Sequence, residues 1–139
     1  MEGASGVKLC FRVDLPPKDL NPNGRVQSRW KNEDTQGYKL QVSATAKNAM
    51  RAAHWVRPER ARVSLWWGLL DRRPVPVKRR DPRYHPEDSD NAVAAAKALF
   101  DGLTLAGAIV DDRWESMELG RVWATRTDGP WIEVEIEAV

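Results

Sequence analysis

Residues 90–107 read DNAVAAAKALFDGLTLAG. The apolar residues of this stretch recur at helical spacing, which predicts a helix over 90–106 with Gly107 as its C-terminal cap. The apolar positions that define this spacing are Val93, Ala96, Phe100, Leu103 and Ala106. A helix between two apolar, extended segments is typical of a sheet in which some strands run parallel.

The segments around this helix have strand and helix patterns of their own. Residues 7–15 alternate apolar and polar side chains, and residues 61–70, ARVSLWWGLL, are rich in aromatic and β-branched residues. Both patterns predict strands. Between them, the spacing of apolar residues over 38–55 predicts a helix that ends before Arg57-Pro58.

The C-terminal part alternates again over 116–125 and 131–138. Thr127-Asp128-Gly129-Pro130 between them has turn chemistry, which predicts an antiparallel hairpin. The predicted order is therefore β-α-β-α-β-β, in an α+β (mixed α/β) fold. We expect a single small domain over residues 1–139.

The composition indicates a globular protein with one core, because 42% of the 139 residues are hydrophobic and 30% are charged. No apolar run is long enough to span a bilayer, and the N-terminus lacks the pattern of a signal peptide. Cys10 is the only cysteine, so no internal disulfide is possible. We therefore expect a cytoplasmic protein without a membrane partner.

A proline-rich loop predicted at about 71–87 carries much of the positive charge, although the net charge is only +2. Its cations are Arg72, Arg73, Lys78, Arg79, Arg80 and Arg83. One interpretation is a solvated basic loop. The other is a surface that contacts phosphates beside the acidic residues that follow.

Acidic residues crowd the start of the 90–106 helix. One aspartate would suffice as an N-cap, but Glu87, Asp88 and Asp90, with Asp111-Asp112 after the helix, exceed this need. Repelling carboxylates are stabilised when a cation holds them. If the apolar run 108–110 pairs with the sheet near residue 88, one aspartate of the pair joins the first two.

Lys97 follows Asp90 by two helical turns, so both are expected on one exposed edge with the small Ala94 between them. Carboxylates without cysteine or histidine partners suit Mg²⁺ or Mn²⁺, which usually meet phosphate groups in proteins. A lysine there could orient water, stabilise charge or protonate a leaving oxygen. The simpler alternative is a surface ion pair between Lys97 and Asp101, four residues later.

The ordered set of these motifs resembles the RusA family of Holliday junction resolvases, which are common in phages and prophages. The motifs are Asp88-Ser89-Asp90-Asn91, Lys97-Ala98-Leu99-Phe100-Asp101, Ala106-Gly107 and Asp111-Asp112. Leu15-Pro16-Pro17, with Asn23 and Arg25, is similar to the family's loop after its first strand. The predicted element order also agrees with the family's small fold.

The resemblance implies roles for individual residues. Asp88, Asp90 and Asp112 match the metal-binding catalytic aspartates, and Asp111 matches the neighbouring family aspartate as a further candidate ligand. Lys97 matches the catalytic lysine, although it lies about one helical turn further from the first motif than in the best-known member. The implied cofactor is Mg²⁺, for which Mn²⁺ should substitute.

The resemblance further implies a homodimer that binds four-way DNA junctions and nicks two opposing strands by phosphodiester hydrolysis. A chain of this size has room for one acidic site, and a twofold dimer supplies the second. The basic loop and Arg25 would contact DNA phosphates, and no small-molecule substrate is expected. Two alternatives remain: a nuclease acting on flaps or forks, and a non-catalytic junction-binding module.

Overall fold

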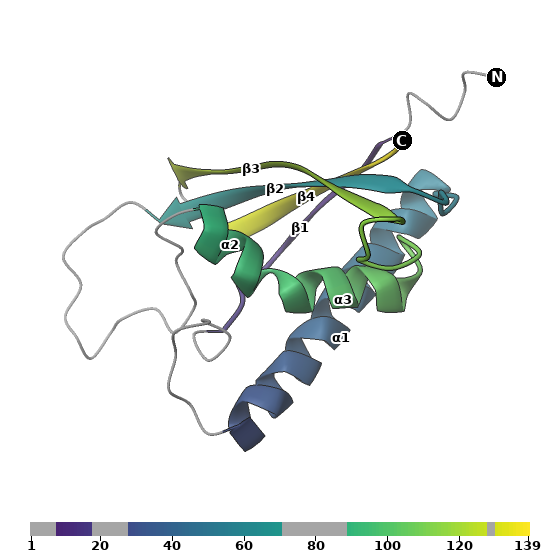
Figure 1. Ribbon diagram of the computed structural model, residues 1–139. Coiled ribbons are helices and arrows are strands. Elements are labelled where there is room, and N and C mark those ends of the chain that lie inside the picture. The colour runs from purple at the N-terminus through teal and green to yellow at the C-terminus, as the bar shows by residue number, and fades with distance from the viewer. Residues whose placement is uncertain (1–7, 18–27, 71–88, 128–129) are drawn as a thin grey trace.

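The computed structural model describes residues 8–17, 28–70, 89–127 and 130–139, and within them the side chains of all but 28–32, 70, 89–91 and 127. The elements form a small α+β domain, which confirms the expected fold class (Figure 1). In chain order they are β1 (Lys8–Val13), α1 (Ser28–Ala53), β2 (Ala61–Leu70), α2 (Ser89–Ala95), α3 (Lys97–Ala106), β3 (Met117–Thr127) and β4 (Trp131–Ala138).

The four strands form one mixed sheet in the order β1-β4-β2-β3. Strands β2 and β3 are parallel, as expected for strands joined through helices, while β4 runs antiparallel to both β1 and β2. The predicted hairpin between the last two strands is wrong, because β2 lies between β3 and β4.

The side chains of β4 explain why it lies inside the sheet rather than beside β3. Ile132, Val134 and Ile136 are fully buried, and their alternation gives β4 one continuous apolar face. A strand paired on both edges covers that face better than a strand at the sheet edge. Strand β3 is an edge strand instead, and its Leu119 and Arg121 side chains are exposed. Turn chemistry at 127–130 therefore did not determine which strands pair.

The helices cover one face of the sheet, and none of the described helices covers the other (Figure 1). Beneath the covered face, α1 and α3 pack against each other. The core joins that face to the helices through fully buried side chains, among them Leu9, Val42, Val63, Leu65, Trp67, Leu99, Leu103 and Ile109.

The open face carries a cluster of three tryptophans from neighbouring strands. Trp66 stacks on Trp123 at 5.9 Å between ring centroids and meets Trp131 edge-on at 4.9 Å. Arginine guanidinium groups lie over two of the rings, with Arg12 over Trp131 and Arg121 over Trp123. The same face carries Glu133, Glu135 and Glu137 paired with neighbouring cations, so its charges are largely balanced.

Helix α1 begins ten residues before the predicted start at 38 and ends at Ala53, close to the predicted end. Its buried side chains are Tyr38, Val42, Ser43 and Ala46. His54 follows with a positive φ of 53°, which ends the helix before Arg57-Pro58.

The predicted helix over 90–106 is divided at Ala96, where the axis changes direction between α2 and α3 (Figure 1). Ala96 is fully buried and still takes part in helical hydrogen bonds, accepting one from Phe100 and donating one to Ala92. The sequence therefore predicted the correct helical span but not its bend.

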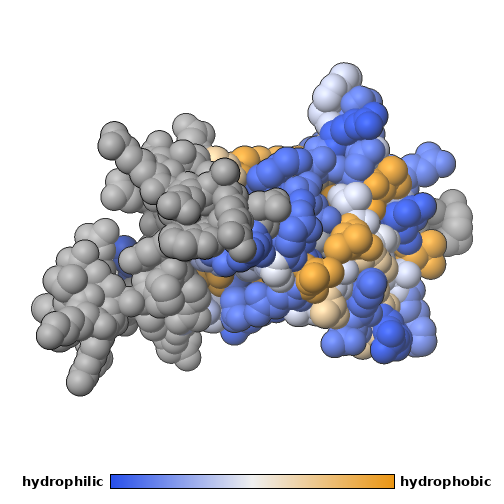
Figure 2. Space-filling view, turned by 90° about the horizontal axis from the view of Figure 1, so that it is seen from below, coloured by the Kyte–Doolittle hydropathy of each residue, from blue (hydrophilic) through white to orange (hydrophobic). Residues whose placement is uncertain are grey.

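The helix side of the molecule is mostly hydrophilic, with small apolar areas between polar ones (Figure 2). The exposed apolar side chains of the described residues include Leu40, Leu105 and Val110. Among the helices described, none is long and apolar enough to cross a membrane.

Candidate functional site

The turn after α3 determines where the Asp111-Asp112 pair lies. Gly107 adopts a left-handed conformation with φ of 81°, as its predicted role as a C-terminal cap requires. Its N–H donates to Thr104 O, and the N–H of Ala108 donates to Leu103 O at 3.0 Å. The chain thereby reverses against α3 instead of continuing away from it.

The apolar run 108–110 does not pair with the sheet, so the predicted route for the aspartates is wrong. Ala108 and Ile109 are instead fully buried as part of the turn. The backbone oxygen of Ala108 accepts a hydrogen bond of 3.0 Å from Trp55 Nε1, which takes the place of a strand partner. This anchored turn sends the chain back along α3 and brings Asp112 to Lys97.

The central contact of the site joins Lys97, the first residue of α3, to Asp112. The Lys97 ammonium donates a hydrogen bond to Asp112 Oδ2. The Lys97 side chain is 64% exposed, whereas that of Asp112 is 25% exposed. The carboxylate is thus seated in the protein surface, and the ammonium reaches it from the solvent side.

Asp101 provides a second carboxylate for the same ammonium. Lys97 Nζ lies 3.2 Å from Asp101 Oδ1, so the predicted i, i+4 pair does form. On its other side, Asp101 Oδ2 lies 3.4 Å from Lys39 Nζ, on α1. Lys97 is therefore both the lysine of an ordinary helical ion pair and the partner of the predicted site aspartate.

The surroundings of Lys97 favour its charged form. The hydrogen bond to Asp112 has the largest effect and raises the pKa of Lys97, and Asp101 adds to this increase. Partial burial acts in the opposite direction but is outweighed. The side chain is accordingly a cation and a proton donor at neutral pH, which makes it unsuitable as a general base.

Asp111 has a different local role from Asp112. Its Oδ1 accepts a hydrogen bond of 3.0 Å from the backbone N–H of Arg113, two residues later, and the Arg113 guanidinium lies 3.9 Å from Oδ2. This pattern is an Asx turn, which shapes the loop that carries Asp112.

Several predicted site residues lie outside the described part. Asp90 and Asn91 are in the first turn of α2, and their side chains are not described. The other positions fall outside the described ranges: Asp88, Arg25, Arg72, Arg73, Lys78, Arg79, Arg80, Arg83 and the whole 71–87 loop. Ala94 and Lys97 are both exposed, as the predicted edge requires, but the bend at Ala96 intervenes.

Within the described ranges, no group of three or more His, Cys, Asp or Glu side chains could hold a metal ion. Carboxylates suit a hard divalent cation, and the structure describes two of the predicted ligands, Asp111 and Asp112, but Asp112 is paired with the Lys97 ammonium. Asp88 and Asp90, whose side chains are not described, would have to complete a site that holds Mg²⁺, so the metal site stays a prediction.

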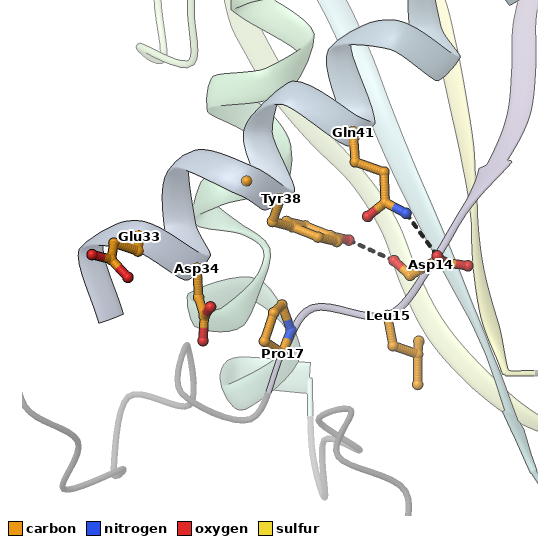
Figure 3. Close-up of a pocket in the computed structure, with 8 residues that line it drawn as sticks. Asp14, Leu15, Pro17, Glu33, Asp34, Tyr38 and Gln41 are labelled. Carbon is orange, nitrogen blue, oxygen red and sulfur yellow. Dashed lines mark hydrogen bonds between the residues drawn. The ribbon is translucent and has the colours of Figure 1, made fainter. Parts of the chain in front are cut away.

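A separate pocket of about 370 Å³ lies between the end of β1 and the first half of α1 (Figure 3). Tyr38 and Gln41 point from α1 toward Asp14. The Tyr38 hydroxyl donates to Asp14 O at 2.7 Å, and Gln41 Nε2 donates to Asp14 Oδ2 at 2.8 Å. Burial raises the pKa of Tyr38, so it remains a hydroxyl donor. Because Glu33 and Asp34 also line it, the pocket is a poor place for a phosphate.

Sequence analysis missed Lys39 as a neighbour of the site. It lies in a stretch of α1 that the apolar spacing marked only as helix, and its contact with Asp101 depends on how α1 crosses α3. The charge of Lys39 is visible in the sequence, but its partner is not.

Comparisons with known proteins add no family to this description. No protein-family model matches the chain, and no curated protein matches it either.

Proposed function

We propose that this protein is a Mg²⁺-dependent endonuclease that cuts branched DNA, with four-way junctions as its substrate. The observation that carries the proposal is the Lys97–Asp112 contact, which joins residues from two separate motifs of the RusA-like set. This contact is expected if both residues serve one site.

The chemistry of the contact suits phosphodiester hydrolysis. A charged Lys97 can stabilise negative charge on a phosphate oxygen or give its proton to the leaving oxygen as the P–O bond breaks. Asp112 keeps that ammonium in place and in its charged form. Bound Mg²⁺ would supply Lewis-acid activation of water and neutralise charge on the phosphate.

The proposal includes a homodimer, because resolving a junction requires two symmetric cuts and one chain offers one Lys97–Asp112 site. The cations of the 71–87 loop, close in sequence to Asp88 and Asp90, are proposed to track phosphates. On the open sheet face, Glu133, Glu135 and Glu137 pair with neighbouring cations and offset their charge, so this face is a less suitable surface for a polyanion than the basic loop.

The test is a cleavage assay on a synthetic four-way junction, a flap, a fork and a linear duplex of matched sequence. Each is incubated with Mg²⁺, Mn²⁺ or EDTA, using wild type and Asp90→Asn. We expect metal-dependent paired nicks in the junction, lost in Asp90→Asn while junction binding is kept.

The other outcomes distinguish the alternatives. Preferred cutting of flaps or forks would retain the nuclease and change its substrate. Binding of the junction without cutting under either metal would make the protein a junction-binding module and refute the catalytic roles.

A further inference from the structure

Four side chains form a line of alternating charge that runs from α1 to the turn after α3. In order they are Lys39, Asp101, Lys97 and Asp112, joined by ion pairs at each step. Asp101 is held between two ammonium groups, and Lys97 between two carboxylates. The line thus extends the Lys97–Asp112 contact to a third element, α1, that contributes nothing else to the described site.

The approach of α1 to α3 makes the first step of this line possible. Gly102, next to Asp101, faces α1 so closely that an added Cβ would lie 2.8 Å from Val42 Cβ and 3.0 Å from Lys39 O. A side chain at this position would push the helices apart. The absence of a side chain at 102 therefore brings the Lys39 backbone, and with it the ammonium, to Asp101.

From Lys97 toward α1, the exposure of the side chains decreases. The Lys97 side chain is 64% exposed, that of Asp101 31%, and that of Lys39 23%. A long, exposed lysine side chain loses considerable rotamer freedom when it is held in one place, and a single helical ion pair opposes this loss only weakly. A carboxylate fixed from the more buried side by Lys39 is a better anchor than one free to rotate.

We propose that Lys39 and Asp101 are positioning residues that hold the Lys97 ammonium against Asp112. This inference rests on the proposed function in so far as Lys97 acts on DNA. Neither residue needs to touch the substrate. Asp101 orients Lys97 directly, and Lys39 acts through Asp101 by fixing its carboxylate and balancing its charge.

The first test does not depend on cleavage. The ¹H–¹⁵N signal of the Lys97 ammonium, assigned with Lys97→Arg, is observable when stable ion pairs slow its exchange with water. We expect this signal in wild type and in the control Lys47→Met, which removes an exposed lysine from α1, the helix that carries Lys39. It should weaken or vanish in Lys39→Met and Asp101→Asn, and return in Lys39→Arg. An unchanged Lys97 signal in Lys39→Met would overturn the proposal.

The second test measures the single-turnover cleavage rate of a four-way junction with Mg²⁺. Lys39→Met should lower the rate constant about 2- to 10-fold, with junction Kd within about twofold of wild type and an unchanged thermal midpoint. Lys39→Arg, which keeps the positive charge, should restore the rate, and the unchanged thermal midpoint of Lys39→Met separates positioning from a loss of stability. A wild-type rate in Lys39→Met would overturn the positioning role. If wild type cuts no branched DNA, the proposed function fails, and the ammonium signal alone decides the positioning.

Discussion

The close approach of α1 and α3 at Gly102 gives a sharp prediction for Gly102→Ala. Alanine is a better helix former than glycine by about 1 kcal/mol, so propensity alone would stabilise the variant. The new methyl group would lie 2.8 Å from Val42 Cβ and 3.0 Å from the backbone oxygen of Lys39. Neither atom can rotate away, because both are fixed by the α1 backbone, and Gly102 is itself buried.

Overpacking costs about 1–3 kcal/mol, and contacts with two atoms that cannot rotate away place Gly102→Ala toward the upper end, above the gain in propensity. We expect Gly102→Ala to lower the free energy of unfolding by about 1–2 kcal/mol. The matched control is Gly37→Ala on α1, where nothing lies within 4 Å of the added Cβ. That variant should gain about 0.5–1 kcal/mol.

The assay is urea denaturation of the two variants and wild type, followed by circular dichroism. The midpoint should fall for Gly102→Ala and rise for Gly37→Ala, with similar slopes. If both glycines gave the same increase, the close approach of the helices would be refuted. The proximity of the helices could then not explain how Lys39 reaches Asp101.

Three further predictions concern other parts of the molecule. Trp67→Phe should change the free energy of unfolding by less than about 1 kcal/mol. The lost ring area is offset because the variant also removes Nε1, a buried donor without a hydrogen-bond partner in the described structure. Urea midpoints should fall further for Trp55→Phe, which breaks the hydrogen bond to Ala108 O. The hydrogen bond from Arg62 lowers the pKa of Glu118 below its ordinary 4.5, so this carboxylate stabilises the fold above that pH and the contribution is lost as pH falls through the lowered value. Urea midpoints on both sides of pH 4.5 should therefore fall less steeply with acid in Glu118→Gln than in Glu115→Gln, and equal slopes would refute this. Neutralising Arg79 and Arg80 together should weaken junction binding and flatten its salt dependence, and an unchanged salt slope would remove both from the DNA surface.

Local patterns in the sequence predicted most of the elements but not how they meet. The span 90–106 was helical and Gly107 capped it, because spacing and a left-handed turn are local properties. The strand order was not predictable from turn residues at 127–130, since β4 pairs with β1 and β2 to bury Ile132, Val134 and Ile136. Pairing over long sequence distances is decided by burial of whole faces.

The candidate site, like the fold, was predicted where local motifs define it and not where distant elements meet. Lys97 and Asp112 were predicted to share a site from their motifs, and they do meet. The route was predicted wrongly, because the run 108–110 packs as a turn under Trp55 rather than as a strand. Lys39 was missed because its relation to Asp101 arises only from the crossing of two helices.

The proposed catalytic contact is tested by mapping strand cleavage of a four-way junction in Mg²⁺ by wild type, Asp112→Asn and the exposed-site control Glu115→Gln. We expect symmetric nicks on two opposing strands by wild type and Glu115→Gln. Asp112→Asn should bind the junction but cut it at least about 100-fold more slowly, as expected when the carboxylate that holds the charged Lys97 at the reacting phosphate is removed. Cleavage by Asp112→Asn at the wild-type rate would contradict the claim that the Lys97–Asp112 contact is the catalytic site.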